Sequence, residues 1–288
     1  MKHDYFLARP GKKIRLDDYD PTFTGEFSTK EAAEAKLAND INRLTEYQDV
    51  LYAQNSYALL IIFQAMDAAG KDGTIKHVMS GVNPQGTQVC SFKVPSAEEL
   101  DHDYLWRCSK SLPERGRIGI FNRSYYEELL VVRVHPEFLN NQQLPPGRLK
   151  KNIWKRRFAD INGFEQYLVR NGIEVLKFFL HLSKEEQRRR FLARIETAAK
   201  NWKFSLNDVK EREYWDSYMK AFEAVFNRTS TKWAPWYIVP ADHKWYTHMV
   251  VADVIAAKLK SLNLKYPELN EQRREELMKA KELLESES

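Results

Sequence analysis

The feature that most constrains the fold of this chain is an apolar run at residues 57–63 that leads directly into a loop of small residues. The run, Tyr-Ala-Leu-Leu-Ile-Ile-Phe, has no polar face, which is typical of a strand buried on both sides of a parallel sheet. Gly70 and Lys71 close the loop, and a helix is predicted from Lys71 to about Ser80. Backbone N–H groups at such a helix start, together with a lysine charge, form a site for an anion. The segment therefore predicts a parallel α/β sheet with a phosphate-binding loop.

The loop has the spacing of a P-loop, G-x-x-x-x-G-K-[ST], with two departures. Ala65 stands where the first glycine belongs, and Asp72 stands where the Mg²⁺-binding hydroxyl belongs. The metal then needs another oxygen, and Asp67 inside the loop can supply it. The spacing alone also fits a plain strand-to-helix connection. Its Gly-Lys-Asp-Gly piece matches the GxxG loop of a nucleic-acid-binding KH module too, but that loop joins two helices, so we expect no nucleic acid.

Short apolar segments alternate with helices along the rest of the chain. Further strands are predicted at residues 87–94, 117–121, 174–182 and 236–240. Alternation of strand and helix gives βαβ units, and hence a parallel sheet with helices on both faces. One helix is predicted to start at Ser28, because Ser28 and Glu31 have the spacing of a capping box, and another at residues 149–170.

These elements predict a single domain of 288 residues. An irregular arm and a helix are expected at about 1–55, the core at about 56–262, and a charged helix at about 263–288. The core is expected to include a helical lid at about 184–232.

Composition excludes several classes of protein. The chain is 43% hydrophobic and 12% aromatic, too rich in apolar residues to be disordered over most of its length. Its longest purely apolar stretch, residues 57–63, is far below the roughly 20 residues of a membrane span. The N-terminus lacks the apolar segment of a secretory signal, and Cys90 and Cys108 have no metal-ligand spacing. We therefore expect a reduced, cytoplasmic protein that does not bind a membrane.

A second polar cluster follows the strand predicted at 117–121. Asn122 and Arg123 come at its carboxyl end, the side where ligands bind in open α/β sheets. Asn122 stands in the Walker B position, which an Mg²⁺-binding aspartate usually occupies. Arg123 can bind phosphate as a bidentate donor. Taken alone, Asn122 and Arg123 would be interpreted as the cap of a strand. Taken together with the loop at residues 65–72, they favour a phosphate site.

Two basic stretches favour a polyanionic partner in a chain whose net charge is only +5. The helix expected after residue 182 carries Arg188, Arg189, Arg190 and Arg194, similar to a small-molecule kinase lid that closes over phosphates. The same helix could instead be solvated, with its arginines paired to neighbouring glutamates. Residues 148–157 are rich in Lys and Arg, and we expect them to bind a long polyanion, more weakly at high salt.

Three ordered motifs together resemble the second polyphosphate kinase family. They are Asp-Ala-Ala-Gly-Lys-Asp-Gly at 67–73, Phe-Asn-Arg-Ser-Tyr-Tyr at 121–126, and Lys-Trp-Ala-Pro-Trp at 232–236 with Pro-Ala-Asp-His-Lys at 240–244. The similarity runs from about residue 19 to 262. It implies an α/β, P-loop kinase-like parallel sheet flanked by helices, with a helical lid, as in thymidylate kinase. It also implies Mg²⁺, with Mn²⁺ as a substitute.

The resemblance implies an activity as well. Asn122 with Glu127 resembles the subgroup that accepts both AMP and ADP, so we expect reversible, in-line transfer of the terminal phosphoryl group of inorganic polyphosphate to AMP and ADP, giving ADP and ATP. A homo-oligomer is expected. Two other functions stay open: an ATP-dependent nucleotide kinase on the same fold, and a non-catalytic polyanion-binding protein.

The predicted site residues fall into four groups. The catalytic group is Asp67, Lys71, Asn122 and Arg123. The phosphate-binding and polyphosphate-binding group is Ala68, Ala69, Gly70, Lys71, Asp72, Gly73, Thr74, Lys76, Arg123, Arg188, Arg190 and Arg194. The nucleotide-binding group is Asn122 and Glu127, and the metal ligand is Asp67.

Overall fold

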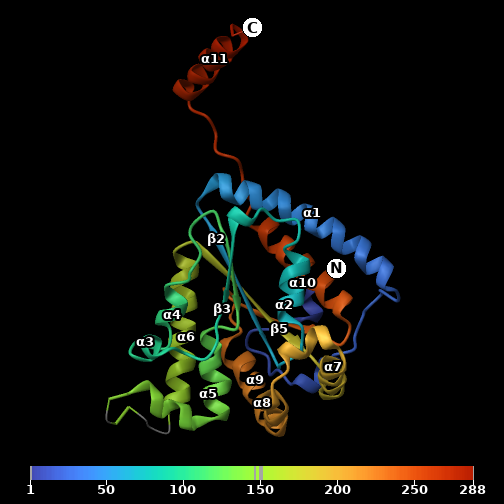
Figure 1. The fold of residues 1–288 in the computed structure, drawn as a ribbon. Helices are drawn as coiled ribbons and strands as arrows, with labels where there is room; N and C mark the ends of the chain where they lie inside the picture. The colour runs from blue at the N-terminus through green and yellow to red at the C-terminus, as the bar shows by residue number, and fades with distance from the viewer. Residues whose placement is uncertain (1, 146, 149–151, 288) are drawn as a thin grey trace.

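The computed structural model describes residues 2–145, 147–148 and 152–287, and within them it contains one six-stranded sheet with helices on both faces (Figure 1). The strands are β1 (Leu7–Ala8), β2 (Ala58–Ala65), β3 (Thr87–Ser91), β4 (Ile118–Asn122), β5 (Ile173–His181) and β6 (Trp236–Pro240). Their order across the sheet is β1-β6-β5-β2-β4-β3. Strands β2 to β6 are parallel, and β1 is antiparallel to β6.

Strand β2 is the centre of the sheet, as the apolar run predicted. It pairs with β4 on one side and with β5 on the other, and its residues from Ala58 to Gln64 are buried. The chain passes from β2 to β3 and β4 on one side and then returns to β5 and β6 on the other. The carboxyl end of β2 is therefore the topological switch point, where open α/β sheets bind their ligands.

Helices cover the two faces of the sheet in separate groups. The longer helices are α1 (Lys30–Gln54), α2 (Lys71–Val78), α6 (Ile153–Arg170), α7 (Lys184–Glu196), α9 (Trp215–Thr229), α10 (Lys244–Ser261) and α11 (Glu271–Glu285). The short ones are α3 (Ala97–Leu100), α4 (Trp106–Ser109), α5 (Val131–Val134) and α8 (Leu206–Lys210). Helices α1, α2 and α10 pack with one face of β2, and α6 and α9 pack with the other (Figure 1).

The N-terminal arm differs from the prediction of an irregular segment. It supplies the edge strand β1, and Phe6, Ile14 and Leu16 are buried in the core. A two-residue strand is too short to give an alternating pattern, so the sequence could not indicate it. Helix α1 begins at Lys30 and is capped by Thr29, whose side chain accepts from the Ala32 N–H. The N-cap predicted at Ser28 is therefore wrong by one residue.

Helix α9 belongs to the core, although it lies within the lid region predicted at 184–232. The ring of its Phe222 packs against that of Phe179 of β5, tilted by 40° and with centroids 4.3 Å apart, and the ring centroid of Phe226 lies 5.2 Å from that of Phe179. Helices α7 and α8 precede it, and the extent of a lid stays a prediction.

The helices predicted at 149–170 and at about 263–288 also differ in their bounds from the observed helices. Helix α6 begins at Ile153, and residues 149–151 of the helix predicted at 149–170 lie outside the described residues. The charged C-terminal helix is present as α11, which projects away from the rest of the molecule with every residue exposed (Figure 1). Among the described residues, no helix has both the length and the apolar character needed to cross a membrane.

A fully buried ion pair joins Glu165 of α6 to Lys177 of β5. Lys177 Nζ lies 2.6 Å from Glu165 Oε2 and also donates to the Tyr126 hydroxyl at 2.9 Å and to the Thr229 carbonyl at 2.7 Å. The Tyr125 and Tyr126 hydroxyls donate to Glu165 Oε1. Burial lowers the pKa of Lys177 and raises that of Glu165, so each charge depends on its partner.

We expect Lys177→Met to lower the free energy of unfolding by about 3–5 kcal/mol, because it leaves the Glu165 carboxylate buried without its cation. Urea denaturation followed by circular dichroism measures the change. The double variant Lys177→Met/Glu165→Leu removes both charges, and it should be more stable than the single variant. A single variant as stable as the parent chain would contradict this account of the core.

Candidate active site

The loop between β2 and α2 has the backbone of an anion site. Ala68 and Gly70 are left-handed, with φ of +63° and +105°, and α2 begins at the next residue, Lys71. A left-handed conformation is strained for alanine and unstrained for glycine. Left-handed residues just before a helix N-terminus are typical of loops whose N–H groups converge on an anion. The loop therefore has the backbone geometry of an anion site, at the switch point of the sheet.

Lys71 folds back over this loop. Its Nζ donates to the Ala65 carbonyl at 3.1 Å, and only 9% of the residue is exposed. Burial and the positive charge of Arg123 lower the pKa of Lys71, while the carboxylates of Asp67, Glu127 and Asp72 act in the opposite direction. A buried cation beside a second cation is stabilised when an anionic ligand binds between them.

Arg123 links the end of β4 to the loop. Its Nη2 donates to Asp67 Oδ1 at 2.8 Å, and its Nη1 donates to Glu127 Oε2 at 3.4 Å. The two carboxylates, Glu127 first, raise the pKa of Arg123 despite its burial, which keeps the guanidinium charged. Arg123 itself is left-handed, with φ of +65°. The structure thus brings together Asp67, Lys71, Arg123 and Glu127, as predicted.

Asn122 faces the loop rather than an open ligand site. Its Nδ2 donates to Asp72 Oδ1 at 2.7 Å. The departure from the Walker B position, Asn122, therefore contacts one departure from the P-loop pattern, Asp72, because its amide donates to the carboxylate that replaces the loop hydroxyl. An aspartate at position 122 would instead place two carboxylates together, which raises the pKa of one of them.

The remaining loop residues have varied surroundings. Thr74 is buried and its hydroxyl donates to the Gly70 carbonyl at 3.0 Å, within the first turn of α2. Lys76 is exposed on the same helix. Among the described residues, no cluster of three or more His, Cys, Asp or Glu side chains could hold a metal ion by itself.

The arginines predicted for the lid lie in three different settings on α7. Arg188 and Arg189 are exposed and pair with Glu185 and Glu186. Arg190 is buried behind the loop and donates to its backbone carbonyls. The structure therefore does not gather these side chains on one phosphate-facing surface. Arg194 is half-buried, and its charge acts on Asp208 of α8.

Asp208 is a residue that sequence reasoning missed. Burial and the negative charge of Asp67 raise its pKa, whereas Arg194, Arg123 and Lys71 oppose that change. Asp208 therefore lies within the electrostatic field of the loop. Helix α8 is five residues long and carries no motif, so the sequence held no signal for this placement.

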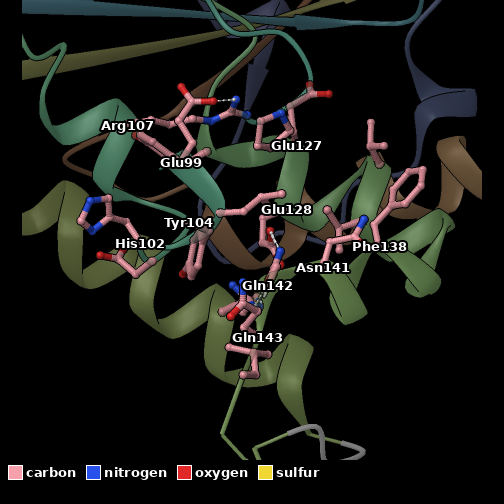
Figure 2. A pocket seen from close by; sticks show the side chains of 18 of the residues that line it. Glu99, His102, Tyr104, Arg107, Glu127, Glu128, Phe138, Asn141, Gln142 and Gln143 are labelled. Carbon is pink, nitrogen blue, oxygen red and sulfur yellow. Dashed lines mark hydrogen bonds and ion pairs between the residues drawn. The ribbon is translucent and has the colours of Figure 1, made fainter. Parts of the chain in front are cut away.

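A cavity of about 980 Å³ adjoins the loop on the β4 side (Figure 2). Arg123, which donates to Asp67 of the loop, lines the cavity, and so does Glu127. Its other walls are partly aromatic, with Phe92, Tyr104 and Phe138. Ligand pockets commonly have this size and mixture of apolar walls and a few polar groups.

Part of the basic stretch at 148–157 lines this cavity too. Arg148, Arg156 and Arg157 are among its wall residues, whereas Lys150 and Lys151 lie outside the described residues. Arg157 is 5% exposed, pairs with Glu128 at 3.0 Å, and donates to Gln142 Oε1 at 2.7 Å. The charge of Arg157 is therefore paired with Glu128 in the wall of the cavity. It does not lie on an open surface, where the sequence had predicted that it would bind a polyanion.

Known proteins match the chain along nearly its whole length. A protein of Rhodopseudomonas palustris named ADP-polyphosphate phosphotransferase is 50% identical over 285 residues, 99% of this chain and 99% of that protein. One of Meiothermus ruber named AMP/ADP-polyphosphate phosphotransferase is 42% identical over 264 residues, 91% of this chain and 95% of that protein.

A solved structure and a family model agree with these relatives. The crystal structure of polyphosphate kinase 2 from Arthrobacter aurescens has a TM-score of 0.86 and 38% identity, and the match covers 98% of both chains. The family model described as polyphosphate kinase 2 (PPK2) matches residues 27–267. The loop geometry, the Arg123 contacts and these matches confirm the resemblance that the three motifs predicted: the chain belongs to the polyphosphate kinase 2 family.

Proposed function

We propose that this protein transfers the terminal phosphoryl group of inorganic polyphosphate to AMP and to ADP, reversibly and with Mg²⁺. One observation carries the proposal: a phosphate-binding loop and a cavity of nucleotide size meet at Arg123 and Glu127. Family membership supports polyphosphate as the donor. The names of two relatives support the acceptors, ADP for the Rhodopseudomonas palustris protein and both AMP and ADP for the Meiothermus ruber protein.

The residues suit a reaction that needs positioning and charge neutralisation. The nucleophile is a terminal phosphate oxygen of the nucleotide, which is ionised at neutral pH, and the leaving polyphosphate is a weak base. Neither needs a strong general base, so in-line phosphoryl transfer depends on alignment and electrostatic stabilisation. Lys71 and Arg123 provide two cations at the loop, and the loop N–H groups add hydrogen-bond donors.

The donor set of the loop fits Mg²⁺. This ion is usually held by one or two carboxylates together with substrate phosphates and water, not by a protein cage. Asp67 and Asp72 offer such carboxylates at the loop, and Asp67 is partly exposed. When bound, Mg²⁺ would offset phosphate charge, and Mn²⁺ would be a substitute.

The cavity is the proposed acceptor site. Tyr104 and Phe138 give it aromatic surface for a base (Figure 2). Arg123 lines the cavity and contacts Asp67 of the loop, so the acceptor phosphate would meet the donor there. Glu127 lines this cavity, which supports the nucleotide contact proposed for it. Asn122 donates to Asp72, so we assign it to the loop. A cytoplasmic location and a homo-oligomer stay predictions.

A nucleotide assay tests the donor. Mg²⁺ and AMP, or Mg²⁺ and ADP, are mixed with the protein and either long-chain polyphosphate or ATP, and products are separated by chromatography. We expect ADP and ATP to form with polyphosphate. Product with ATP as the better donor would instead indicate an ATP-dependent nucleotide kinase. No turnover with either donor would indicate a polyanion-binding protein.

We expect Lys71→Ala to lower kcat by about 10²–10³-fold, because the variant removes a cation from the developing phosphate charge. Steady-state kinetics with polyphosphate and ADP measure the effect. Lys260→Ala, which removes an exposed lysine of α10, is the matched control and should keep the parent rate. Equal rates in both variants would contradict the assignment of the loop.

We expect Asn122→Asp to lower kcat/KM by about tenfold at neutral pH, because it places a second carboxylate against Asp72 and turns a hydrogen bond into repulsion. Repulsion raises the pKa of the pair, so the deficit should shrink as the pH falls. The double variant Asn122→Asp/Asp72→Ser removes the repulsion and should recover activity. A single variant with unchanged pH dependence would show that the contact has no role.

A further inference from the structure

We infer that one face of α7, formed by Gln187 and Arg190, holds the phosphate-binding loop in its binding conformation. Both are positioning residues that act through the loop backbone and do not contact phosphate. The inference rests on the proposed function only in that the loop is the site of the phosphoryl donor.

The contacts are consecutive along the loop. Gln187 Nε2 donates to the Asp67 carbonyl at 2.9 Å. Arg190 Nη1 donates to the Ala68 carbonyl at 3.0 Å and to the Ala69 carbonyl at 2.9 Å. Gln187 and Arg190 are three residues apart on a helix and so share one face. One face of α7 therefore binds three successive carbonyls of the loop.

This arrangement fixes the N–H groups as well. In a planar trans peptide the carbonyl and the N–H of the same unit point in opposite directions. Holding the carbonyls of Asp67, Ala68 and Ala69 toward α7 therefore directs the N–H groups of the three following residues away from α7. Ala68 is left-handed, a conformation that alanine leaves readily unless its surroundings hold it.

Arg190 has no hydrogen left for a phosphate. Its Nη2 donates to the Ala241 carbonyl at 2.6 Å and to the Asp242 carbonyl at 3.0 Å, and its Nε donates to Glu186 Oε1 at 2.7 Å. With the two bonds from Nη1, these contacts engage all five N–H groups of the guanidinium. Arg190 is also 7% exposed. It therefore joins the loop to the segment that follows β6.

The side chains of Asp242 and Arg212 hold α7 itself. The Asp242 carboxylate accepts from the Ser183 N–H at 2.8 Å and from the Ser183 hydroxyl at 2.7 Å, at the N-cap of α7. Arg212 Nη1 donates to Gln187 Oε1 at 2.7 Å and to the Lys184 carbonyl at 3.1 Å. The amide of Gln187 is thus oriented by Arg212 on one side and by the loop on the other.

Gln187→Glu is the sharpest test. A glutamate still accepts from Arg212 but cannot donate to the Asp67 carbonyl, so the variant removes one loop contact and keeps the packing. We expect faster amide hydrogen exchange in the peptide that covers residues 64–73. We also expect the KM for polyphosphate to rise about tenfold or more and kcat to fall, with the KM for ADP within about twofold of the parent value.

The control variant is Glu185→Gln, which changes an exposed side chain of the same helix that pairs with Arg188. It should leave exchange, both KM values and the melting temperature unchanged. Simple loss of folded enzyme would lower kcat without changing either KM, so the split between the two KM values separates positioning from destabilisation. Unchanged loop exchange and an unchanged KM for polyphosphate in Gln187→Glu would overturn the inference.

Arg190→Lys separates positioning from direct phosphate binding. A lysine keeps the charge but cannot bridge the loop carbonyls to those of Ala241 and Asp242. We expect it to show the same faster loop exchange and raised KM for polyphosphate. Full activity in Arg190→Lys would overturn the inference in favour of a simple charge effect. Amide hydrogen exchange of the loop is measured without turnover. It therefore tests the inference in the same way if ATP, and not polyphosphate, is the donor.

Discussion

The parallel pairing of β2 with β4 and β5 is the constraint on which the site depends. Parallel strands that pair in register bring their carboxyl ends to one edge of the sheet. At that edge β2 continues into the phosphate-binding loop, β4 into Asn122 and Arg123, and β5 into the N-cap of α7. Two segments that are far from the loop in sequence therefore meet around it, and each contributes a different type of contact to it.

The contacts around the loop compensate for its unusual sequence. A P-loop with aspartate in place of its hydroxyl carries an extra negative charge at a site that must bind phosphate. Asn122 donates to that aspartate, and Arg123 pairs with the other loop carboxylate, Asp67. From the opposite side, α7 binds the loop carbonyls, so carboxylates and backbone are held by separate groups. The two loop carboxylates, Asp72 and Asp67, are thus each paired with a residue at the end of β4.

The sequence predicted the centre of this structure well and its periphery less well. An apolar run with no polar face has few alternatives to a central parallel strand, so β2 was confirmed where it was expected. The loop after it has a recognisable spacing, and the structure places Lys71 and Arg123 beside it, while their roles stay predictions. Arg190 is an example of what the sequence could not predict. Its position in an arginine-rich helix indicated a phosphate contact, but the sequence does not show which way a helix faces its neighbours. Asp208 and the cavity depend on segments with no motif.

The sequence by itself determined the family, the parallel strands β2 to β6, several of the longer helices, and the loop between β2 and α2 as a predicted phosphate site. These properties are local, because they follow from apolar runs, turn residues and the spacing of a few motifs. Only the tertiary structure decided which arginine reaches a carboxylate, which one reaches a carbonyl, and which two elements enclose the cavity. The physical reason is that the contact of Arg123 with Asp67 and those of Arg190 with the loop carbonyls join residues far apart in sequence. Their distances are set by how strands and helices pack in and on the sheet.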